Sequence, residues 1–408
     1  MSARARTGNA AKNILDGIRI VDFTHMVAGP LSTMILADMG ADVIKVEPPD
    51  GETSRHLGDV VFGDQTDYFL SLNRNKRSIV LDLKSEEGLQ AAKALIATSD
   101  IVVENFRAGK AEKMGLGYKA MASQNPALIY CSVNGFGSKS RFRDKPALDP
   151  IIQALSGLMN LTGTPETGPL KTGFLIGDFV PPLFATIGLL AALYERQISG
   201  KGQFLDVAML DSLVFTMIPR ETRFLANGIP PRLVGNGHNQ LAPANTYYTS
   251  DARQIVVFCH TPKYWHMLAR MLDREDLMED VRFVSNAARV ANKAVLDEIL
   301  EAEFLRKPLS HWLGLIDRDG VTAGPVRTLE EVFGDEEVQQ NMLASVSRSG
   351  VGHAKVLRTP IGFGRTPLQI HSAPPMLGEH TEEILMELKA RRLLPHDERS
   401  RSKEDDDE

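Results

Sequence analysis

The first half of the chain alternates short apolar runs with segments in which apolar residues recur at helical spacing. The apolar runs, which predict strands, cover residues 17–23, 41–46, 77–83, 100–104 and 128–133. Helical spacing with suitable start and stop residues covers 30–39, 85–95 and 118–124. Because strands that alternate with helices usually pair in parallel, this half predicts a parallel sheet with helices on both faces.

The second half has a different pattern. Its expected elements are, in chain order, a strand at 203–209, a long loop rich in Gly, Pro and Asn at 228–245, a strand at 254–260, a helical region at 261–312, a strand at 320–326 and a helix at 384–394. Trp265 and Trp312 are expected core residues of the helical region. The pattern predicts a large α/β domain and a smaller α+β domain after about residue 225.

Composition is that of a soluble globular protein, since 43% of the 408 residues are hydrophobic and 24% are charged. The net charge of -6 provides no general attraction for nucleic acid. Cys131 and Cys259 lie far apart in apolar runs. We therefore expect two buried thiols in a reducing compartment, the cytoplasm or, as the alternative, the mitochondrial matrix.

Three further classes of function are disfavoured. No Cys/His cluster has the spacing of a zinc site, so no metal is expected. The apolar stretch 180–194 is shorter than the roughly 18 residues that cross a bilayer, so no membrane partner is expected. The Gly-x-Gly pieces at 115–117, 135–137 and 235–237 lack the third glycine of a dinucleotide fingerprint, which argues against an NAD enzyme.

Basic and amide residues cluster in loops that follow predicted strands. One cluster is Asn73–Arg77, and another is Asn105–Lys110 together with Lys113. Ligands of open α/β sheets bind at the C-terminal ends of the strands, so these side chains are candidates to hold phosphates, and Phe106 and Met114 are candidates to pack against an adenine ring. The alternative is a solvated basic surface.

Asp178 ends the stretch 173–178 and is followed by Pro181, Pro182 and the apolar run 183–194. This pattern predicts a carboxylate at the N-terminus of a buried helix, where the helix dipole keeps it ionised. Such a group can be a nucleophile, and the alternative is an ordinary helix N-cap with proline in the first turn. His25 follows a strand end and, taken alone, is more simply structural.

Several ordered motifs identify the chain as similar to the family III CoA-transferases, the group that includes formyl-CoA transferase and α-methylacyl-CoA racemase. The first two resemblances are at 21–30 and 40–47. Later ones are at 73–79, 103–106 with 113–118, 155–163 with 177–178, 323–326 and 377–381. The resemblance runs from about Leu15 to Leu394.

The resemblance implies a Rossmann-like large domain built from both chain ends, with a smaller domain between them. We expect the large domain at 15–224 and 326–394, the smaller at 225–325, and disordered tails at 1–14 and 395–408. Family members form homodimers of two interlocked chains. No tightly bound cofactor is implied, and acyl-CoA and a free carboxylic acid are the implied substrates.

The resemblance also implies the chemistry. The aspartate matched by Asp178 attacks an acyl-CoA thioester to form a mixed anhydride. Backbone N–H groups near Asp178, or in the loop containing Gly235 and Gly237, are candidates to stabilise the oxyanions. His25 and Asp149 are further active-site candidates. The implied CoA-binding residues are Val27, Ala28, Asn73, Arg74, Asn75, Lys76, Asn105, Phe106, Lys113 and Met114.

Departures from the family pattern narrow the reaction. Members that transfer formyl or oxalyl groups have Gln where this chain has Val27, which makes formate or oxalate exchange an unfavoured reading. Racemase members have His where this chain has Leu148, and a two-base racemase needs that base. Basic residues in the loop 138–141 suit a dicarboxylate acyl group. We therefore expect a CoA-transferase, succinyl-CoA being one suitable donor, with a racemase or a non-catalytic CoA-binding protein as alternatives.

Overall fold

The computed structural model describes residues 13–394, which divide into two compact units. The first is formed by the described residues up to Ser156, by Gly173–Met217 and by the residues from Gln340 onward. The second is formed by Gly157–Thr172 and Ile218–Gln339. Segment 157–172, which the sequence pattern had placed in the large domain, joins the second unit, where the Gly163 carbonyl accepts a hydrogen bond from the Gly235 N–H at 2.7 Å.

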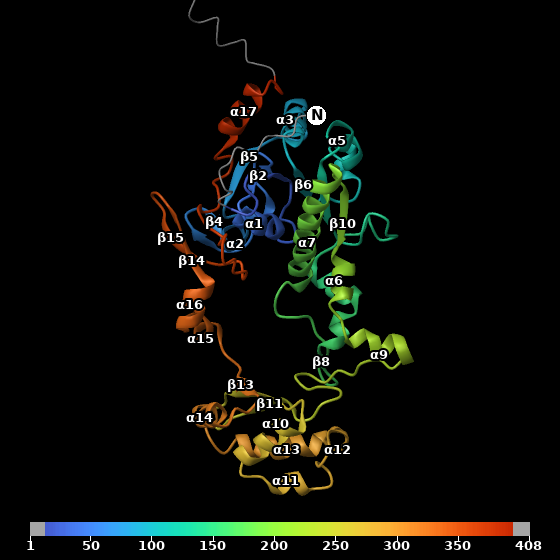
Figure 1. The fold of residues 1–408 in the computed structure, drawn as a ribbon, viewed down its shortest axis with the longest axis vertical. Coiled ribbons are helices and arrows are strands. Elements are labelled where there is room, and N and C mark those ends of the chain that lie inside the picture. Colours follow the sequence, from blue (N-terminus) through green and yellow to red (C-terminus); the bar gives the residue numbers. More distant parts are fainter. Residues whose placement is uncertain (1–12, 395–408) are drawn as a thin grey trace, which may run out of the picture. The chain divides into compact units, whose positions relative to one another are not determined.

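A six-stranded parallel sheet organises the first unit (Figure 1). Its strands are β1 (Arg19–Asp22), β2 (Asp42–Glu47), β5 (Lys76–Val80), β6 (Ile101–Glu104), β7 (Ile129–Asn134) and β10 (Phe204–Ala208). Their order is β10-β7-β6-β1-β2-β5. Along the chain, β2 and β5 are added in turn on one side of β1, and β6, β7 and β10 are then added in turn on its other side. The order of the strands therefore reverses between β1 and β6.

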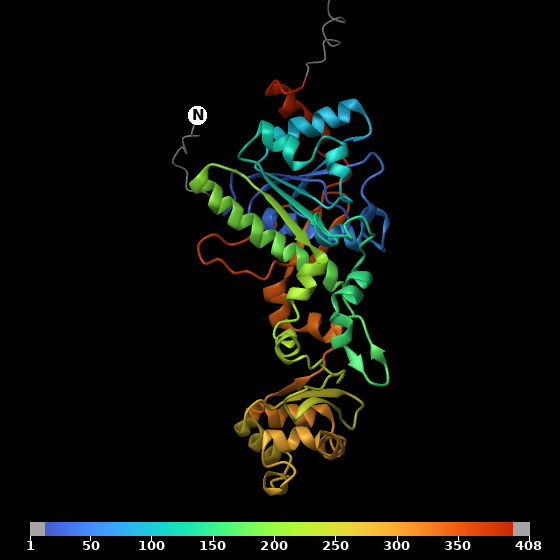
Figure 2. The same ribbon diagram turned by 90° about the vertical axis from the view of Figure 1, so that its right-hand side faces the viewer.

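Both faces of this sheet are covered, as the alternation of strands and helices predicts. Successive strand residues enter different cores: Ile20 packs with α1 (Pro30–Asp38) and α7 (Ile176–Ser199), whereas Val21 packs with α3 (Glu86–Ala97) and α17 (Thr381–Ala390). Figure 2 shows α7, in green, along one face and α3, in light blue, on the other. Cys131 is buried in the α7 core as a free thiol.

The remaining elements of the first unit are short helices and strand pairs. The helices are α2 (Asp67–Leu72), α4 (Lys110–Lys113), α5 (Tyr118–Gln124), α6 (Asp149–Ser156), α8 (Met209–Phe215) and the 3-10 turn η1 (Thr53–His56). The antiparallel pairs are β3 (Val60–Phe62) with β4 (Gln65–Thr66), and β14 (Leu343–Arg348) with β15 (Gly352–Leu357). Strands β3 and β4 are too short to give a clear period in the sequence, and the six-residue strands β14 and β15 were not predicted.

Helix α7 differs from its prediction as a buried helix. One face packs on the sheet, but Leu183, Ile187, Tyr194 and Ile198 are exposed on the other. Spacings of four and seven residues, about one and two helical turns, place these side chains on one stripe. By length and composition alone α7 also suffices to cross a membrane, although a core helix of a soluble protein passes the same test.

The second unit contains an antiparallel sheet packed against helices. The sheet consists of β11 (Ala244–Tyr248), β12 (Gln254–Phe258) and β13 (Ala323–Pro325). The helices are α9 (Arg220–Asn227), α10 (Pro262–Met271), α11 (Asp276–Glu279), α12 (Asn286–Ala291), α13 (Lys293–Phe304), α14 (Leu309–Asp319) and α15 (Leu329–Gly334), with α16 (Glu336–Met342) at the boundary. The pair β8 (Gly163–Thr164) and β9 (Gly168–Pro169) follows η2 (Leu158–Leu161). Trp265, Trp312 and Cys259 are buried in its core.

Candidate active site

His25 and Asn105 meet at the point where the strand order reverses. The backbone N–H of His25 donates to Asn105 Oδ1, and Asn105 Nδ2 donates to the His25 carbonyl, both at 2.9 Å. These residues follow the C-terminal ends of β1 and β6. Such a reversal leaves a crevice beyond the strand ends, which is the usual ligand site of an open α/β sheet. The two candidates therefore stand where a nucleotide-like ligand is expected.

Aromatic and basic groups surround this pair. The Phe106 ring lies 6.1 Å from the His25 ring, and Lys110 Nζ stands 4.8 Å from the Phe106 centroid. Burial lowers the pKa of His25, and the positive charge of Lys45 adds to the effect. His25 is therefore neutral at pH 7, so its imidazole is able to accept a proton or a hydrogen bond.

The turn after His25 is strained. Met26 has φ 64°, a left-handed conformation that non-glycine residues seldom adopt, and its N–H donates to Glu52 Oε2 at 3.2 Å. Val27 and Ala28 follow and are buried in the α7 core. Strain of this kind persists where the surroundings determine the backbone, and it is concentrated at functional sites.

The four candidates from Asn73 to Lys76 have side chains that point inward. Arg74 pairs with Asp38 at 2.6 Å, and Asn75 donates to the same carboxylate at 2.9 Å. Lys76 Nζ bonds Asp22 Oδ2 at 3.0 Å and Asn73 Oδ1 at 2.9 Å. Because these bonds are internal, the side chains can contact CoA only by giving them up. The backbone is also engaged in part, since the Asn75 N–H donates to the Ser372 carbonyl at 3.3 Å and Lys76 pairs with β2.

A cavity of about 320 Å³ opens beside Phe106, at the ends of β6 and β7. Arg107, Asn134, Arg143 and Phe204 contribute to its lining. Lys113 is exposed, and Met114 packs on the neighbouring apolar core. The cavity lining therefore combines two arginines and two aromatic rings with three acidic residues, Glu104, Glu112 and Asp144.

Asp178 is the third residue of α7, and Leu175, not Asp178, occupies the N-cap position. The N-cap interpretation of Asp178 is therefore wrong. Pro181 and Pro182 fall inside the helix instead of in its first turn. Within the described part of the chain, the half-buried carboxylate of Asp178 has no hydrogen-bond or ion-pair partner.

Asp149 fixes the start of α7. Its Oδ1 accepts a 2.6 Å hydrogen bond from the Gly177 N–H, and its Oδ2 accepts one from Gln153 at 2.8 Å. Burial raises the pKa of Asp178 to about 6, and the negative charge of Asp149 contributes. The expected stabilisation of the charged form by the helix N-terminus is thus outweighed. At neutral pH the carboxylate is still mostly ionised, and its raised basicity favours nucleophilic attack.

Gly235 and Gly237 lie in the second unit, and their N–H groups are already engaged. The Gly235 N–H donates to Gly163, and the Gly237 N–H donates to the Val234 carbonyl at 2.8 Å. They are therefore not free donors for an oxyanion in this conformation. Both glycines instead fix the loop, with Gly235 at φ 56°.

Two groups at the strand ends were missed by the sequence reading. Glu104 lines the cavity beside Phe106 and accepts a 2.6 Å hydrogen bond from the Phe106 N–H. Burial raises its pKa to about 7, in spite of that bond and one with Ser132. Asp22 sits under the turn and pairs with Lys76. Asp22 and Glu104 are each the charged last residue of a strand, directly after an apolar run. This pattern could have identified them in the sequence as candidate site residues.

Comparison with known proteins assigns the chain to a family. The model of "CoA-transferase family III" matches residues 15–381. The chain therefore belongs to this family and is a CoA-transferase, which confirms the sequence-based recognition.

Named relatives and solved structures agree with this assignment. A succinate–glutarate CoA-transferase of Agrobacterium fabrum is 35% identical over 92% of this chain and 96% of its own length. An acetyl-CoA:oxalate CoA-transferase of Acetobacter aceti is 36% identical over 81% and 86%. A CAIB/BAIF family protein from Brucella suis, at 35% identity, covers 92% of this chain and 99% of its own, with a TM-score of 0.84.

Proposed function

We propose that this CoA-transferase works through a mixed anhydride on Asp178. The observation that carries the proposal is a half-buried, unpaired carboxylate next to Asp149, with its pKa raised to about 6. Such a group is mostly charged at neutral pH, and no cation among residues 13–394 forms an ion pair with it. It is therefore a stronger nucleophile than an ordinary aspartate.

The reaction balances without any other reagent. The Asp178 carboxylate attacks the acyl-CoA carbonyl, and CoA thiolate leaves. The thiolate attacks the aspartyl carbonyl of the anhydride, which releases the donor acid and leaves an aspartyl-CoA thioester. The acceptor carboxylate displaces the thiolate to form a second anhydride, and the thiolate then takes the new acyl group. Asp178 is regenerated, with no net proton or electron change.

Dicarboxylic acids are the proposed substrates, with succinyl-CoA as one donor. The support is that one relative named above is called after two dicarboxylic acids, succinate and glutarate, and the other after acetyl-CoA and the dicarboxylic acid oxalate. Val27 still leads us to prefer a longer diacid over oxalate. The chemistry requires one carboxylate to react while the other stays charged in the site.

For CoA, we propose the cavity beside Phe106 as the nucleotide site. Phe106 and Phe204 offer aromatic surface there, and Arg107 and Arg143 offer charge for phosphates. Asn105 and His25 hold the adjacent edge, and Lys113 and Met114 stand on the following segment. Asn73–Lys76 shape the neighbouring loop through their buried contacts.

We further propose that the chain is a homodimer, with the exposed stripe of α7 in the interface. Ile187 is 62% exposed and Ile198 is 76% exposed on an otherwise well-packed helix. An apolar face of this kind usually marks a site of association. A second copy of the chain is the occupant that the family resemblance implies.

Substitution of Asp178 tests the mechanism. Asp178→Ala and Asp178→Asn should lower acyl-CoA:acid exchange by about 10³-fold or more, whereas Asp211→Asn, an exposed acid in the first turn of α8, should not. Hydroxylamine should convert the parent, but not the variants, to a hydroxamate at Asp178, detected by mass spectrometry. Normal exchange by Asp178→Ala rules out the mechanism. Deuterium uptake at C2 of a 2-methylacyl-CoA without an acid acceptor indicates a racemase instead.

A further inference from the structure

The turn from Thr24 to Met26, which follows β1, is held by side chains from other parts of the first unit. Lys45 Nζ donates to the Thr24 carbonyl at 2.8 Å, and the Met26 N–H donates to Glu52 Oε2 at 3.2 Å. The residue between them exchanges two hydrogen bonds with Asn105, as described above. Each residue of this turn, called here the 24–26 turn, therefore has a backbone group bound by a side chain.

Lys45 and Glu52 also form an ion pair with each other. The Nζ–Oε1 distance is 3.5 Å, and neither side chain has any exposed surface. Burial opposes the charge of Lys45, but the carboxylates of Glu52 and Asp22 raise its pKa above the usual value. Burial likewise opposes the charge of Glu52, but Lys45 and hydrogen bonds from Ser54 lower its pKa. Both members of the pair are therefore ions in the folded protein.

The pair is part of a larger buried network of charges. Asp22 pairs with Lys76 at 3.0 Å, and Glu47 pairs with Arg55 at 2.6 Å. With Lys45 and Glu52 the network has three cations and three anions, all of them at most 8% exposed in their side chains. Buried ion pairs contribute little net stability, because the cost of desolvation offsets the attraction. Their presence next to the 24–26 turn therefore indicates a role other than stability.

The 24–26 turn has a conformation that needs such support. Met26 has φ 64°, which costs a non-glycine residue about 1–3 kcal/mol unless its surroundings determine the backbone. The bond from its N–H to Glu52 opposes relaxation of this residue. On the other side, a Cβ at Gly29 would stand 2.2 Å from the Cβ of Thr24, so the returning chain closes tightly on the turn.

The 24–26 turn also lies where a ligand is expected. It stands at the reversal of strand order, and the candidate CoA-binding residues Val27 and Ala28 follow it directly. Lys45 and Glu52 have no exposed surface, so they can affect a ligand only through the backbone that they hold. A turn that is already in its binding conformation loses less free energy when the ligand binds.

We propose that the buried Lys45–Glu52 pair is a positioning element that holds the 24–26 turn in its left-handed conformation, so that the turn is preformed for CoA. This inference rests on the proposed binding of CoA at the edge formed by His25 and Asn105, and it adds the residues that hold this edge in place. Glu52 fixes the strained residue, and Lys45 both balances the charge of Glu52 and binds the preceding carbonyl.

Two substitutions of Glu52 in the full-length enzyme test the proposal. Glu52→Ala removes the acceptor of the Met26 N–H, whereas Glu52→Gln keeps an oxygen at that place. Calorimetric titration of CoA gives the Kd of each protein. Glu52→Ala should raise the Kd about tenfold or more, because binding must then supply the strain of the turn. Glu52→Gln should raise it less than Glu52→Ala. An unchanged Kd in Glu52→Ala overturns the proposal.

A double variant covers the case in which Glu52→Ala does not fold, since that change leaves the Lys45 charge buried without its partner. Lys45→Met with Glu52→Ala removes both charges and should raise the Kd for CoA in the same way. The matched control is Arg196→Met with Asp100→Asn, a pair at 3.0 Å that precedes β6, at the opposite end of that strand from Asn105. The control should leave the Kd unchanged. Equal increases in both double variants indicate a general loosening of the sheet and overturn the proposal.

Glycine at position 26 separates positioning from a purely structural role of Glu52. Glycine adopts a positive φ without steric cost. Adding Met26→Gly to Glu52→Ala should therefore bring the Kd for CoA back to within about threefold of the parent value. Met26→Gly alone shows whether the methionine side chain itself contributes to binding. A Kd that stays high in the combined variant, while Met26→Gly alone binds normally, shows that Glu52 does not act through the strained turn.

Phe106→Ala separates this inference from the proposed CoA site. Titration of CoA needs no turnover, so none of these results depends on Asp178. A weakened Phe106→Ala variant with an unchanged Glu52→Ala variant supports the proposed site and overturns the positioning role. The reverse result supports the positioning role and shows that CoA does not use the cavity beside Phe106.

Discussion

The carboxylate of Asp149 holds the backbone N–H of Gly177 at 2.6 Å, one residue before the proposed nucleophile. The same carboxylate contributes to the raised pKa of Asp178. One side chain therefore has two effects: it sets the position of the helix start, and its charge makes the neighbouring carboxylate more basic. Asp149 is a positioning residue in this arrangement, because its own oxygens are engaged by Gly177 and Gln153.

The pH dependence of kcat/KM should report the protonation of the Asp178 carboxylate. Its pKa of about 6 means that the carboxylate gains a proton as pH falls through that value, well above the usual range of aspartate. We expect kcat/KM for the acyl-CoA donor to be level at neutral pH and to fall about tenfold per pH unit well below the pKa. Initial rates between pH 4.5 and 8 measure this limb. A level profile down to pH 4.5 contradicts the raised pKa.

Asp149→Asn should move that limb toward lower pH. The substitution removes a like charge beside Asp178, and the asparagine Oδ1 can still accept the Gly177 hydrogen bond. Substrate ionisation is the same for parent and variant, so a displaced limb belongs to the enzyme. Identical limbs in the two proteins show that the observed titration is not that of Asp178.

Asp178→Asn should stabilise the protein at neutral pH. Burial raises the folded-state pKa above the unfolded value, so the folded state binds the proton more tightly. The contribution of this group to stability is present below the unfolded pKa and is lost as pH rises through about 6. Removing the charge should raise the free energy of unfolding at pH 7.5 by about 1–3 kcal/mol. Urea unfolding at equal protomer concentration measures it, and a destabilised variant contradicts it.

Gly177→Ala should lower both stability and activity. A Cβ at this position stands 2.8 Å from Asp149 Oδ1, so the carboxylate or the helix start must shift. We expect a loss of about 1–3 kcal/mol in unfolding free energy and a reduced kcat, because Asp178 follows directly. Gly314→Ala is the control, since nothing lies within 4 Å of its Cβ in α14. Equal behaviour of the two variants argues against close contact at Gly177.

Ile187→Asp should prevent assembly of the proposed homodimer. A charge in the centre of the α7 stripe loses its water if that surface is covered by a second copy. Sedimentation should show a smaller species for this variant than for the parent. Val281→Asp, at a site 82% exposed in the second unit, should leave the parent species unchanged. A parent protein that sediments as a monomer refutes the interface.

The sequence predicted the sheet better than the site. Strands such as Ile101–Glu104 are continuous apolar runs, so their residue types are sufficient to indicate them. Lys76 illustrates the opposite case. In the sequence it is one cation of a basic loop, but its burial depends on Asp22, more than fifty residues away. Local pattern carries no information on such a partner.

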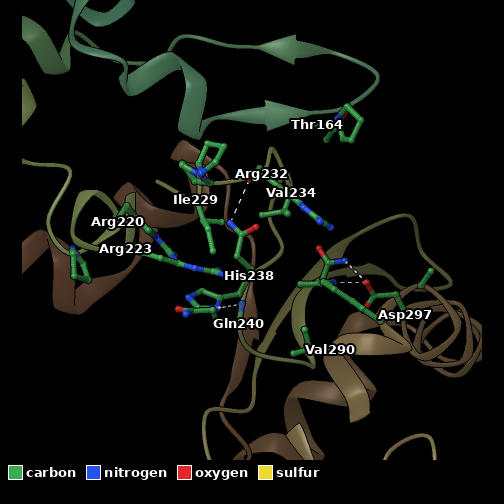
Figure 3. Close-up of a pocket in the computed structure, with 18 of the residues that line it drawn as sticks. Thr164, Arg220, Arg223, Ile229, Arg232, Val234, His238, Gln240, Val290 and Asp297 are labelled. Atoms are coloured by element: carbon green, nitrogen blue, oxygen red, sulfur yellow. Dashed lines mark hydrogen bonds and ion pairs between the residues drawn. The ribbon is translucent and has the colours of Figure 1, made fainter. Parts of the chain in front are cut away.

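The position of Asp178 shows a second limit. Sequence reasoning proposed Asp178 as the nucleophile but placed the helix start too late, because two prolines usually mark a first turn. In the structure the helix begins at Ile176, and the backbone N–H of Gly177 donates a hydrogen bond to the Asp149 carboxylate. Likewise, Arg220 and Arg223 of α9 and Arg232 of the following loop line a single cavity of the second unit (Figure 3), and local pattern alone does not predict that they come together.

The discontinuity of the first unit has a consequence for how the protein is made. Arg19 of β1 pairs with Glu387 of α17, 368 residues later, and Ile384 and Leu388 complete the core on that face of the sheet. The second unit, in contrast, ends at Gln339. During synthesis it can complete its core on the ribosome while the sheet still waits for its last helix. Truncations before α17 should therefore leave that face of the sheet without part of its core, whereas the second unit keeps all of its residues.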